Sequence, residues 1–171
     1  STGDIIFLAD QDDIWDTNKV RRMLEVFEMF PDALSVSCAY DLIDQNGKEI
    51  RSRFSVSQKK DSCVRQIPWK SFVLSTRFPG MSMAIKKELL VKLCDLPSEM
   101  IPAHDWLLNE AAAYYNGMYY LGEILTHYRQ HDNNCVGAVK TDTSDNLLAG
   151  REHTIDFFSK THSAIMYMRK E

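Results

Sequence analysis

The residues of this chain with the clearest chemical potential are three carboxylates that follow an apolar run near the N-terminus. The run covers residues 5–9, and Asp10, Asp12 and Asp13 come directly after it. Such a run is typical of a buried strand, and ligands of open α/β sheets bind where the strands end. Because clustered carboxylates repel one another, we expect a cation or a set of hydrogen-bond donors to compensate them. An isolated Asp-x-Asp is more often a solvated turn that caps the next helix, so the rest of the chain decides between the two.

Two further groups of polar residues stand where structural elements are predicted to begin or end. The first is His-Asp-Trp at residues 104–106, at the predicted start of a helix. The second is the polar segment 128–134, Tyr-Arg-Gln-His-Asp-Asn-Asn, after a predicted strand. Each has an ordinary explanation, with Asp105 as a helix N-cap, and Arg129 and His131 as solvated loop residues. We therefore weigh the groups together.

Composition places the chain among ordinary globular proteins. It has 171 residues, of which 44% are hydrophobic and 26% charged, enough for one domain with a packed core. The net charge of −4 provides no basic surface, so we expect no nucleic-acid partner. The four cysteines are widely spaced without a C-x-x-C pair, which is typical of reduced thiols in the cytoplasm. No apolar run reaches the roughly 18 residues that a membrane span needs.

Strand patterns mixed with helix patterns predict an α/β fold. Apolar residues at helical spacing predict a first helix that begins with a cap at Asp16 or Thr17 and ends before Pro31. Asn46-Gly47 is a strong hairpin signal. Strands are predicted at residues 5–9, 34–43, 48–54, 81–85 and 118–128, the last interrupted at Gly122; further helices at 68–74, 86–94, 104–116 and 145–170; and polar loops at 55–66 and 129–144.

Taken together, four segments resemble the family 2 inverting glycosyltransferases, which have the GT-A fold, and within them the bacterial rhamnosyltransferase-like members. The segments are residues 5–15 (a strand with Asp-Gln-Asp-Asp-Ile-Trp), 78–84 (Phe-Pro-Gly-Met-Ser-Met-Ala), 104–106 and 128–134, and the resemblance covers about residues 3–137. It implies an α/β fold of the GT-A type, with a mixed sheet flanked by helices.

The resemblance also implies a truncated domain. In the family, the nucleotide-binding units precede the Asp-x-Asp strand, whereas this chain begins only a few residues before that strand. We therefore expect those N-terminal units to be missing. Residues 1–144 would be the C-terminal portion of the catalytic domain, and residues 145–171 a helical extension.

The resemblance assigns the acidic residues to a nucleotide-sugar donor and its metal. The last Asp of the family's Asp-x-Asp is the metal ligand and corresponds to Asp12, while Asp10 would lie near the donor ribose or a metal-bound water. Asp13 would orient this donor-binding loop or simply begin the approach to the helix. The cation would be Mg²⁺ or Mn²⁺, because both take carboxylate oxygens and both can neutralise a diphosphate. His131 matches a family histidine that adds a metal ligand, which would favour Mn²⁺.

The remaining matches concern the acceptor and the donor sugar. Asp105 matches the catalytic base, which takes a proton from the acceptor hydroxyl in an inverting displacement. A helix N-terminus lowers the pKa of a carboxyl group, so burial or neighbouring carboxylates would have to offset that effect. His104 stands where many family members carry Glu. Gly80 and Met81 resemble the loop that lets the backbone approach the donor sugar, and Arg129 would meet a donor phosphate.

The function implied by the resemblance is transfer of a sugar from a nucleotide-diphosphate donor to a glycan or lipid-linked acceptor in cell-surface polysaccharide synthesis. The subfamily suggests dTDP-rhamnose as the donor. We further expect a cytoplasmic location, peripheral contact with the inner face of the membrane through the C-terminal helix, and a homodimer formed through exposed sheet surface. The chain alone is expected to be inactive.

Two other functions remain open at this point. Phosphotransferases of the haloacid-dehalogenase type also place Asp-x-Asp after an apolar strand, although their motif usually continues to Thr where this chain has Asp13-Ile14-Trp15. A non-catalytic carbohydrate- or partner-binding domain would carry an acidic loop with no role in catalysis.

Overall fold

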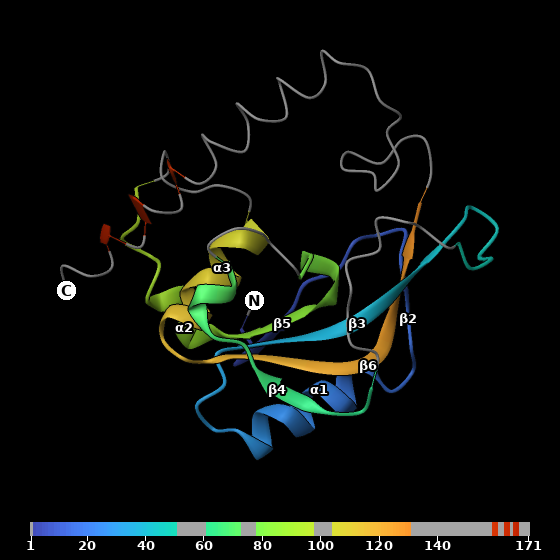
Figure 1. Cartoon of the computed structure of the whole chain (residues 1–171), viewed down its shortest axis with the longest axis horizontal. Helices are drawn as coiled ribbons and strands as arrows, with labels where there is room; N and C mark the ends of the chain where they lie inside the picture. Colours follow the sequence, from blue (N-terminus) through green and yellow to red (C-terminus); the bar gives the residue numbers. More distant parts are fainter. Residues whose placement is uncertain are drawn as a thin grey trace, which may run out of the picture.

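The computed structural model consists of one mixed sheet with helices packed against it (Figure 1). The structure describes residues 2–50, 61–72, 78–97 and 104–130, and in the C-terminal stretch residues 159–160, 163–164 and 166–167. The strands are β1 (Ile5–Phe7), β2 (Ile14–Trp15), β3 (Ser35–Ile43), β4 (Val64–Gln66), β5 (Met83–Lys86) and β6 (Met118–Arg129). The α-helices are α1 (Lys19–Met29), α2 (Lys87–Val91) and α3 (His104–Tyr114), and short 3-10 helices cover Trp69–Phe72 (η1) and Gly80–Ser82 (η2). The predicted α/β class is confirmed.

The sheet is built on a parallel pair of long strands. Its order is β1-β5-β3-β6-β2, with β4 also paired to β6. Strands β3 and β6 run parallel, from Ser35 beside Met118 to Ile43 beside Arg129, and the other pairs are antiparallel. The C-terminal ends of both long strands therefore lie next to each other. The acidic residues 10–13 and the start of the polar segment 128–134 are found at these ends.

Helices cover both faces of this sheet (Figure 1). Successive residues of a strand point to opposite faces. Met118 and Tyr120 of β6 accordingly pack in the core shared with α2 and α3, whereas Tyr119 and Leu121 pack in the core shared with α1. The buried face of α1 consists of Lys19, Met23, Val26 and Phe27. The sheet thus separates two hydrophobic cores, with α1 on one face and α3 on the other.

The elements differ from the sequence-based predictions in several places. Strand β2 was not predicted, and β6 continues through Gly122, where an interruption was predicted, with only a shift in its register with β3. The apolar run at 5–9 was predicted to be a buried strand, but β1 is only half-buried and pairs with β5 alone. The predicted loop at 55–66 contains strand β4, because residues 64–66 find hydrogen-bond partners on the open side of β6. The return strand predicted at 48–54 is reduced, over its described part, to a bridge between Ile43 and Glu49.

The C-terminal stretch is described only in short pieces, all of them helical. Ala164 is fully buried among residues of the α3 core, and Tyr167 packs against the same core. The proposed boundary at residue 144 and most of the predicted helix 145–170 lie outside the described residues. Among the helices that the structure describes, none has the length and apolarity to cross a membrane.

Candidate active site

The three clustered carboxylates lie on the loop that joins β1 to β2. Asp10 is exposed, whereas Asp12 and Asp13 are partly buried. The loop continues into β2, where Ile14 pairs with His127 of β6. Strand β2 therefore places the acidic loop beside the C-terminal end of β6, where the polar segment 128–134 begins.

Arg129 joins these two groups directly. Its main-chain N–H donates a hydrogen bond of 2.9 Å to Asp13 Oδ1, and its Nε donates one of 2.8 Å to the carbonyl oxygen of Asp12. Its Nη1 donates to the carbonyl oxygens of Asp44 and Gln45, at 3.0 and 2.9 Å. The guanidinium thus braces the acidic loop against the turn that follows β3. Its proposed contact with a donor phosphate stays a prediction.

Asp13 is the most perturbed carboxyl group of the loop. Burial raises the pKa of Asp13 to about 6; the hydrogen bond from Arg129 opposes this shift, and the charges of Asp10 and Asp12 add to it. Within the described part of the chain its Oδ2 is buried and has no hydrogen-bond partner. This oxygen would gain most from a nearby cation or donor.

Lys19 is a buried cation beneath the acidic loop, and sequence reasoning missed it. Its side chain is fully buried, and its Nζ donates a hydrogen bond of 2.7 Å to the carbonyl oxygen of Met81. The same nitrogen lies 3.8 Å from the ring centroid of Trp15. Burial lowers the pKa of Lys19 to about 8, while Cys38, Asp13 and Asp10 raise it. One sequence signal was present, because Lys19 lies four residues before Met23 on the apolar face of α1.

Gly80 brings the second polar group to the end of β1. A Cβ atom placed on Gly80 would lie 3.0 Å from His104 Nε2, 3.7 Å from Asp105 Cβ and 3.7 Å from Leu8 Cδ1. The η2 turn therefore passes between the start of α3 and the residue that follows β1. Gly80 thus packs against protein side chains, among them that of the proposed base. The predicted approach of its backbone to a donor sugar stays a prediction.

Asn109 fixes the start of α3 against the segment that precedes η2. Its Nδ2 donates hydrogen bonds of 2.7 Å to the carbonyl oxygens of Phe78 and Asp105. Asp105 is partly buried, and its Oδ1 accepts a hydrogen bond of 2.9 Å from the Trp106 amide. Because α3 begins at His104, Asp105 lies within its first turn and is not the N-cap residue. Its carboxylate accepts from the next amide of the chain, an interaction that does not conflict with a role as a base.

Sequence reasoning also missed a pair of side chains next to the acidic loop. His127 Nδ1 and Asp41 Oδ1 are 2.6 Å apart, and both residues are partly buried on the neighbouring strands β6 and β3. Their pairing follows from the β3–β6 register, in which Asp41 stands beside His127. Strand register between segments so far apart leaves no local sequence signal.

The described residues suit a cation that is held jointly with a substrate. Within the described ranges, no three His, Cys, Asp or Glu side chains converge as a metal cage. Mg²⁺ in nucleotide sites is typically held by one or two carboxylates together with phosphate oxygens, so a complete protein cage is not required. The buried, unpartnered oxygen of Asp13 beside Asp10 and Asp12 fits such a shared cation. His131, the other predicted ligand, lies outside the described residues.

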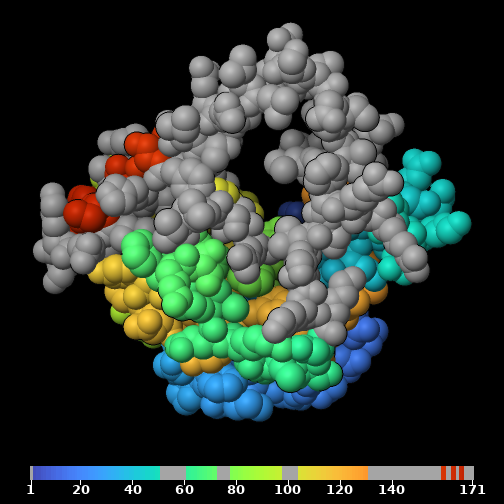
Figure 2. Space-filling model, in the orientation of Figure 1, coloured from blue at the N-terminus to red at the C-terminus, as the bar shows by residue number. Residues whose placement is uncertain are grey.

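A hollow of about 540 Å³ lies elsewhere, between α1 and the residues that precede β4. Figure 2 shows these two segments, in blue and green, adjoining at the lower edge of the molecule. The hollow is lined mainly by polar and charged residues, among them Asp16, Arg22 and Glu123, and its lining includes neither the acidic loop nor Asp105.

Comparison with known proteins supports the resemblance seen in the sequence. No family model matches the chain. The chain is 25% identical over 148 residues to an uncharacterised glycosyltransferase of Nostoc sp., a match that covers 85% of the chain and 45% of that protein. It is 29% identical over 142 residues to the dTDP-rhamnosyl transferase RfbG of Shigella flexneri, a match that covers 79% of the chain and 46% of the relative. The chain is similar to glycosyltransferases. It spans less than half the length of the curated relatives it matches.

Proposed function

We propose that the protein containing these residues is an inverting, metal-assisted glycosyltransferase of the GT-A type. The observation that carries the proposal is the meeting of the predicted segments. Gly80 packs against both Leu8 and the His104–Asp105 pair, and Arg129 binds the loop of Asp12 and Asp13. The two relatives described above are named as a glycosyltransferase and a rhamnosyl transferase, which favours this function over a phosphotransferase of the haloacid-dehalogenase type.

In this mechanism Asp105 is the base. Its carboxylate accepts the proton of the acceptor hydroxyl while the acceptor oxygen forms a bond to the anomeric carbon and the bond from that carbon to the diphosphate breaks. Asn109 holds the first turn of α3 through the Asp105 carbonyl, which would limit the drift of the base. Inversion follows from attack on the face opposite the leaving group.

The acidic loop would receive the donor diphosphate. Asp12 would hold a divalent cation, with His131 as a second ligand, and Asp10 and Asp13 would complete the carboxylate surface around it. When bound, Mg²⁺ or Mn²⁺ would neutralise negative charge on the departing diphosphate. Arg129 keeps the main chain of Asp12 in place through its Nε, whatever it contributes to phosphate binding.

The relative named as a dTDP-rhamnosyl transferase makes dTDP-rhamnose the donor to test first. A glycan or lipid-linked glycan is the proposed acceptor. We propose residues 1–144 as part of the catalytic domain and residues 145–171 as its extension.

The test is sugar transfer by the full-length protein. A panel of nucleotide-diphosphate sugars that includes dTDP-rhamnose would be offered with Mn²⁺, with Mg²⁺ and with a chelator. The proposal expects transfer that needs the metal and falls on the order of 100-fold in Asp12→Ala. A non-catalytic binding domain would instead give no transfer with any donor, and a phosphotransferase would release inorganic phosphate from phosphate esters.

A further inference from the structure

We propose that Lys19 is a positioning residue of this site. Its buried ammonium fastens the carbonyl of Met81 to the helix that follows the acidic loop, so that the metal side and the base side of the site are held as one unit. The inference rests on the proposed function for its catalytic consequence. Its structural part, the fastening of the η2 turn, can be tested without any activity.

The ammonium of Lys19 has an unusual set of neighbours for a lysine. Lysine is almost never fully buried unless its charge is paired or hydrogen-bonded. Here the side chain is fully buried, its Nζ donates to Met81 O at 2.7 Å, and the Trp15 ring lies below it at 3.8 Å. Asp10 and Asp13 also act on this charge through space. The Lys19 ammonium therefore contacts β2 and the η2 turn, and it is attracted by the charges of the acidic loop.

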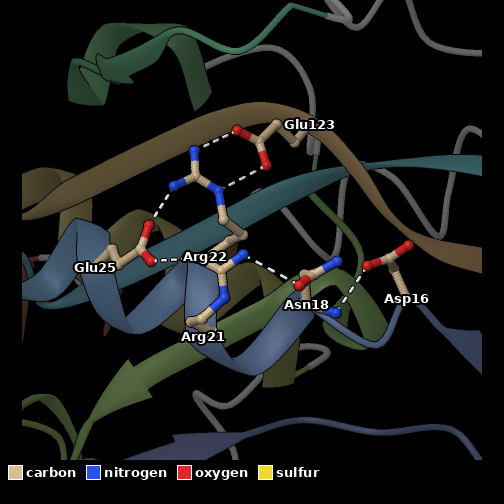
Figure 3. Close-up of polar contacts among 6 residues, drawn as sticks. All are labelled: Asp16, Asn18, Arg21, Arg22, Glu25 and Glu123. Carbon is tan, nitrogen blue, oxygen red and sulfur yellow. Dashed lines mark hydrogen bonds and ion pairs between the residues drawn. The ribbon is translucent and has the colours of Figure 1, made fainter.

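The backbone of Lys19 is itself held firmly. The Lys19 amide donates to Asp16 O at 3.0 Å, and Asp16 Oδ1 accepts from the Asn18 amide at 2.8 Å. Figure 3 shows Arg22, one turn further along α1, between Glu25 of the same helix and Glu123 of β6. Arg22 Nε donates to Glu123 Oε2 at 2.9 Å. The first turn of α1 is thus anchored to the sheet, and Lys19 reaches inward from a fixed base.

The other end of the contact leads to Asp105. Met81 and Gly80 are adjacent in η2, and Gly80 packs against His104 and Asp105. The Met81 carbonyl is also approached by Thr126 Oγ1, at 3.5 Å. A series of contacts therefore runs from Trp15, which follows the acidic loop in β2, through Lys19 and the η2 turn to the proposed base. Loss of the ammonium would remove the 2.7 Å hydrogen bond to this carbonyl and leave the longer contact from Thr126 Oγ1 in place.

The experiment compares two substitutions of Lys19 in the full-length protein. Lys19→Met keeps most of the side-chain volume but removes the charge and the donor. Lys19→Gln removes the charge but keeps an N–H donor on a side chain one atom shorter. The control is Lys86→Met, because Lys86 Nζ also donates to a main-chain carbonyl, that of Pro31 at 2.5 Å, and lies 5.9 Å from the Phe27 ring. That contact is exposed and belongs to the far end of β5.

The first readout is amide hydrogen exchange. The Ser82 amide donates to Pro79 O and the Leu8 amide to Met83 O, whereas the Lys86 amide donates to Leu34 O away from the turn. In Lys19→Met we expect exchange at Ser82 and Leu8 to rise about tenfold with Lys86 unchanged. In Lys19→Gln we expect a smaller rise, about threefold. Unchanged exchange at Ser82 in the variants would overturn the proposal, and if Lys19→Met does not fold, Lys19→Gln decides alone.

The second readout is steady-state transfer. We expect kcat/KM for the donor to fall about 10- to 100-fold in Lys19→Met, to fall less in Lys19→Gln, and to stay at the wild-type value in Lys86→Met. An equal fall of kcat/KM in the two Lys19 variants would mean that only the charge of Lys19 matters. That result would overturn the proposal that its hydrogen bond to Met81 positions the η2 turn. A purely structural lysine would lower the melting temperature and leave kcat/KM of the folded protein unchanged, which would also overturn it. Loosened exchange in a protein that transfers no sugar would reject the proposed function alone.

Discussion

The main-chain amide of Arg129 donates a 2.9 Å hydrogen bond to Asp13 Oδ1 across 116 residues of sequence. The Arg129 side chain adds donors to the carbonyl oxygens of Asp12, Asp44 and Gln45. The end of β6 therefore supports the acidic loop by both main chain and side chain. A loop of mutually repelling carboxylates needs such donors to hold one conformation.

The first prediction concerns this brace. Arg129→Met removes the donors to three carbonyls but keeps the main-chain bond to Asp13, so we expect a loss of about 2 kcal/mol in the free energy of unfolding. Urea denaturation measures it. Arg21→Met is the matched control, because the Arg21 side chain is 61% exposed and its ion pair with Glu25 lies on the surface of α1. The control should change stability by no more than about 0.5 kcal/mol. Equal effects of the two substitutions would contradict the bracing role.

The second prediction concerns the close approach at Gly80. Gly80→Ala would place a Cβ 3.0 Å from His104 Nε2, so the ring must move by a few tenths of an ångström. We expect a small loss of stability, about 0.5–1 kcal/mol, and a larger loss of transfer activity because Asp105 lies next to that ring. In a double-mutant cycle, His104→Ala should remove most of the stability cost of Gly80→Ala. Additive costs would show that the two residues do not contact each other.

The third prediction is a pH effect of Glu110 in α3. Its side chain is only 5% exposed, and burial raises the pKa of Glu110 to about 7. The folded protein holds this proton more tightly than the unfolded chain does. The contribution of protonated Glu110 to the free energy of unfolding is therefore fully present below about pH 4 and is lost as the pH rises through about 7. Glu110→Gln should therefore stabilise the protein by about 2 kcal/mol at pH 8 and by almost nothing at pH 4.

The control for Glu110 has the opposite sign. The hydrogen bond from Arg22 lowers the pKa of Glu123, so its contribution to stability is present at neutral pH and is lost in acid. Glu123→Gln should destabilise the protein at pH 7, and the difference from wild type should shrink as the pH falls. Chemical denaturation at several pH values measures both variants. A Glu110→Gln profile parallel to that of the wild type would show that Glu110 titrates normally.

Much of the architecture could be predicted from local sequence patterns. The helix at α1, the strand at β3, the turn at Gly47 and the end of α3 before Gly117 each have a local signal, and the structure confirms them. Gly47 has a φ of 83°, as the hairpin turn requires. Strand β4 was missed because its three residues carry no clear alternation and are held only by pairing with β6.

The candidate site was predicted in part, for a physical reason. The acidic loop, Gly80 and Asp105 stand out by residue type at element ends, and the structure brings Gly80 to Asp105. Lys19 was missed because a lysine at a helix start is normally a surface residue. The His127–Asp41 pair was missed because it depends on the register of two strands distant in sequence. Long-range partners of this kind require the assembled sheet.

The most direct test of the account is to remove the proposed base while preserving its shape. In the full-length protein, Asp105→Asn should lower kcat for sugar transfer about 1,000-fold and change the dissociation constants of donor and Mn²⁺ by less than about threefold. Asp95→Asn, an exposed aspartate elsewhere on the chain, should transfer sugar at the wild-type rate. Wild-type transfer by Asp105→Asn would contradict the account, because the residue that meets Gly80 would then not be the base.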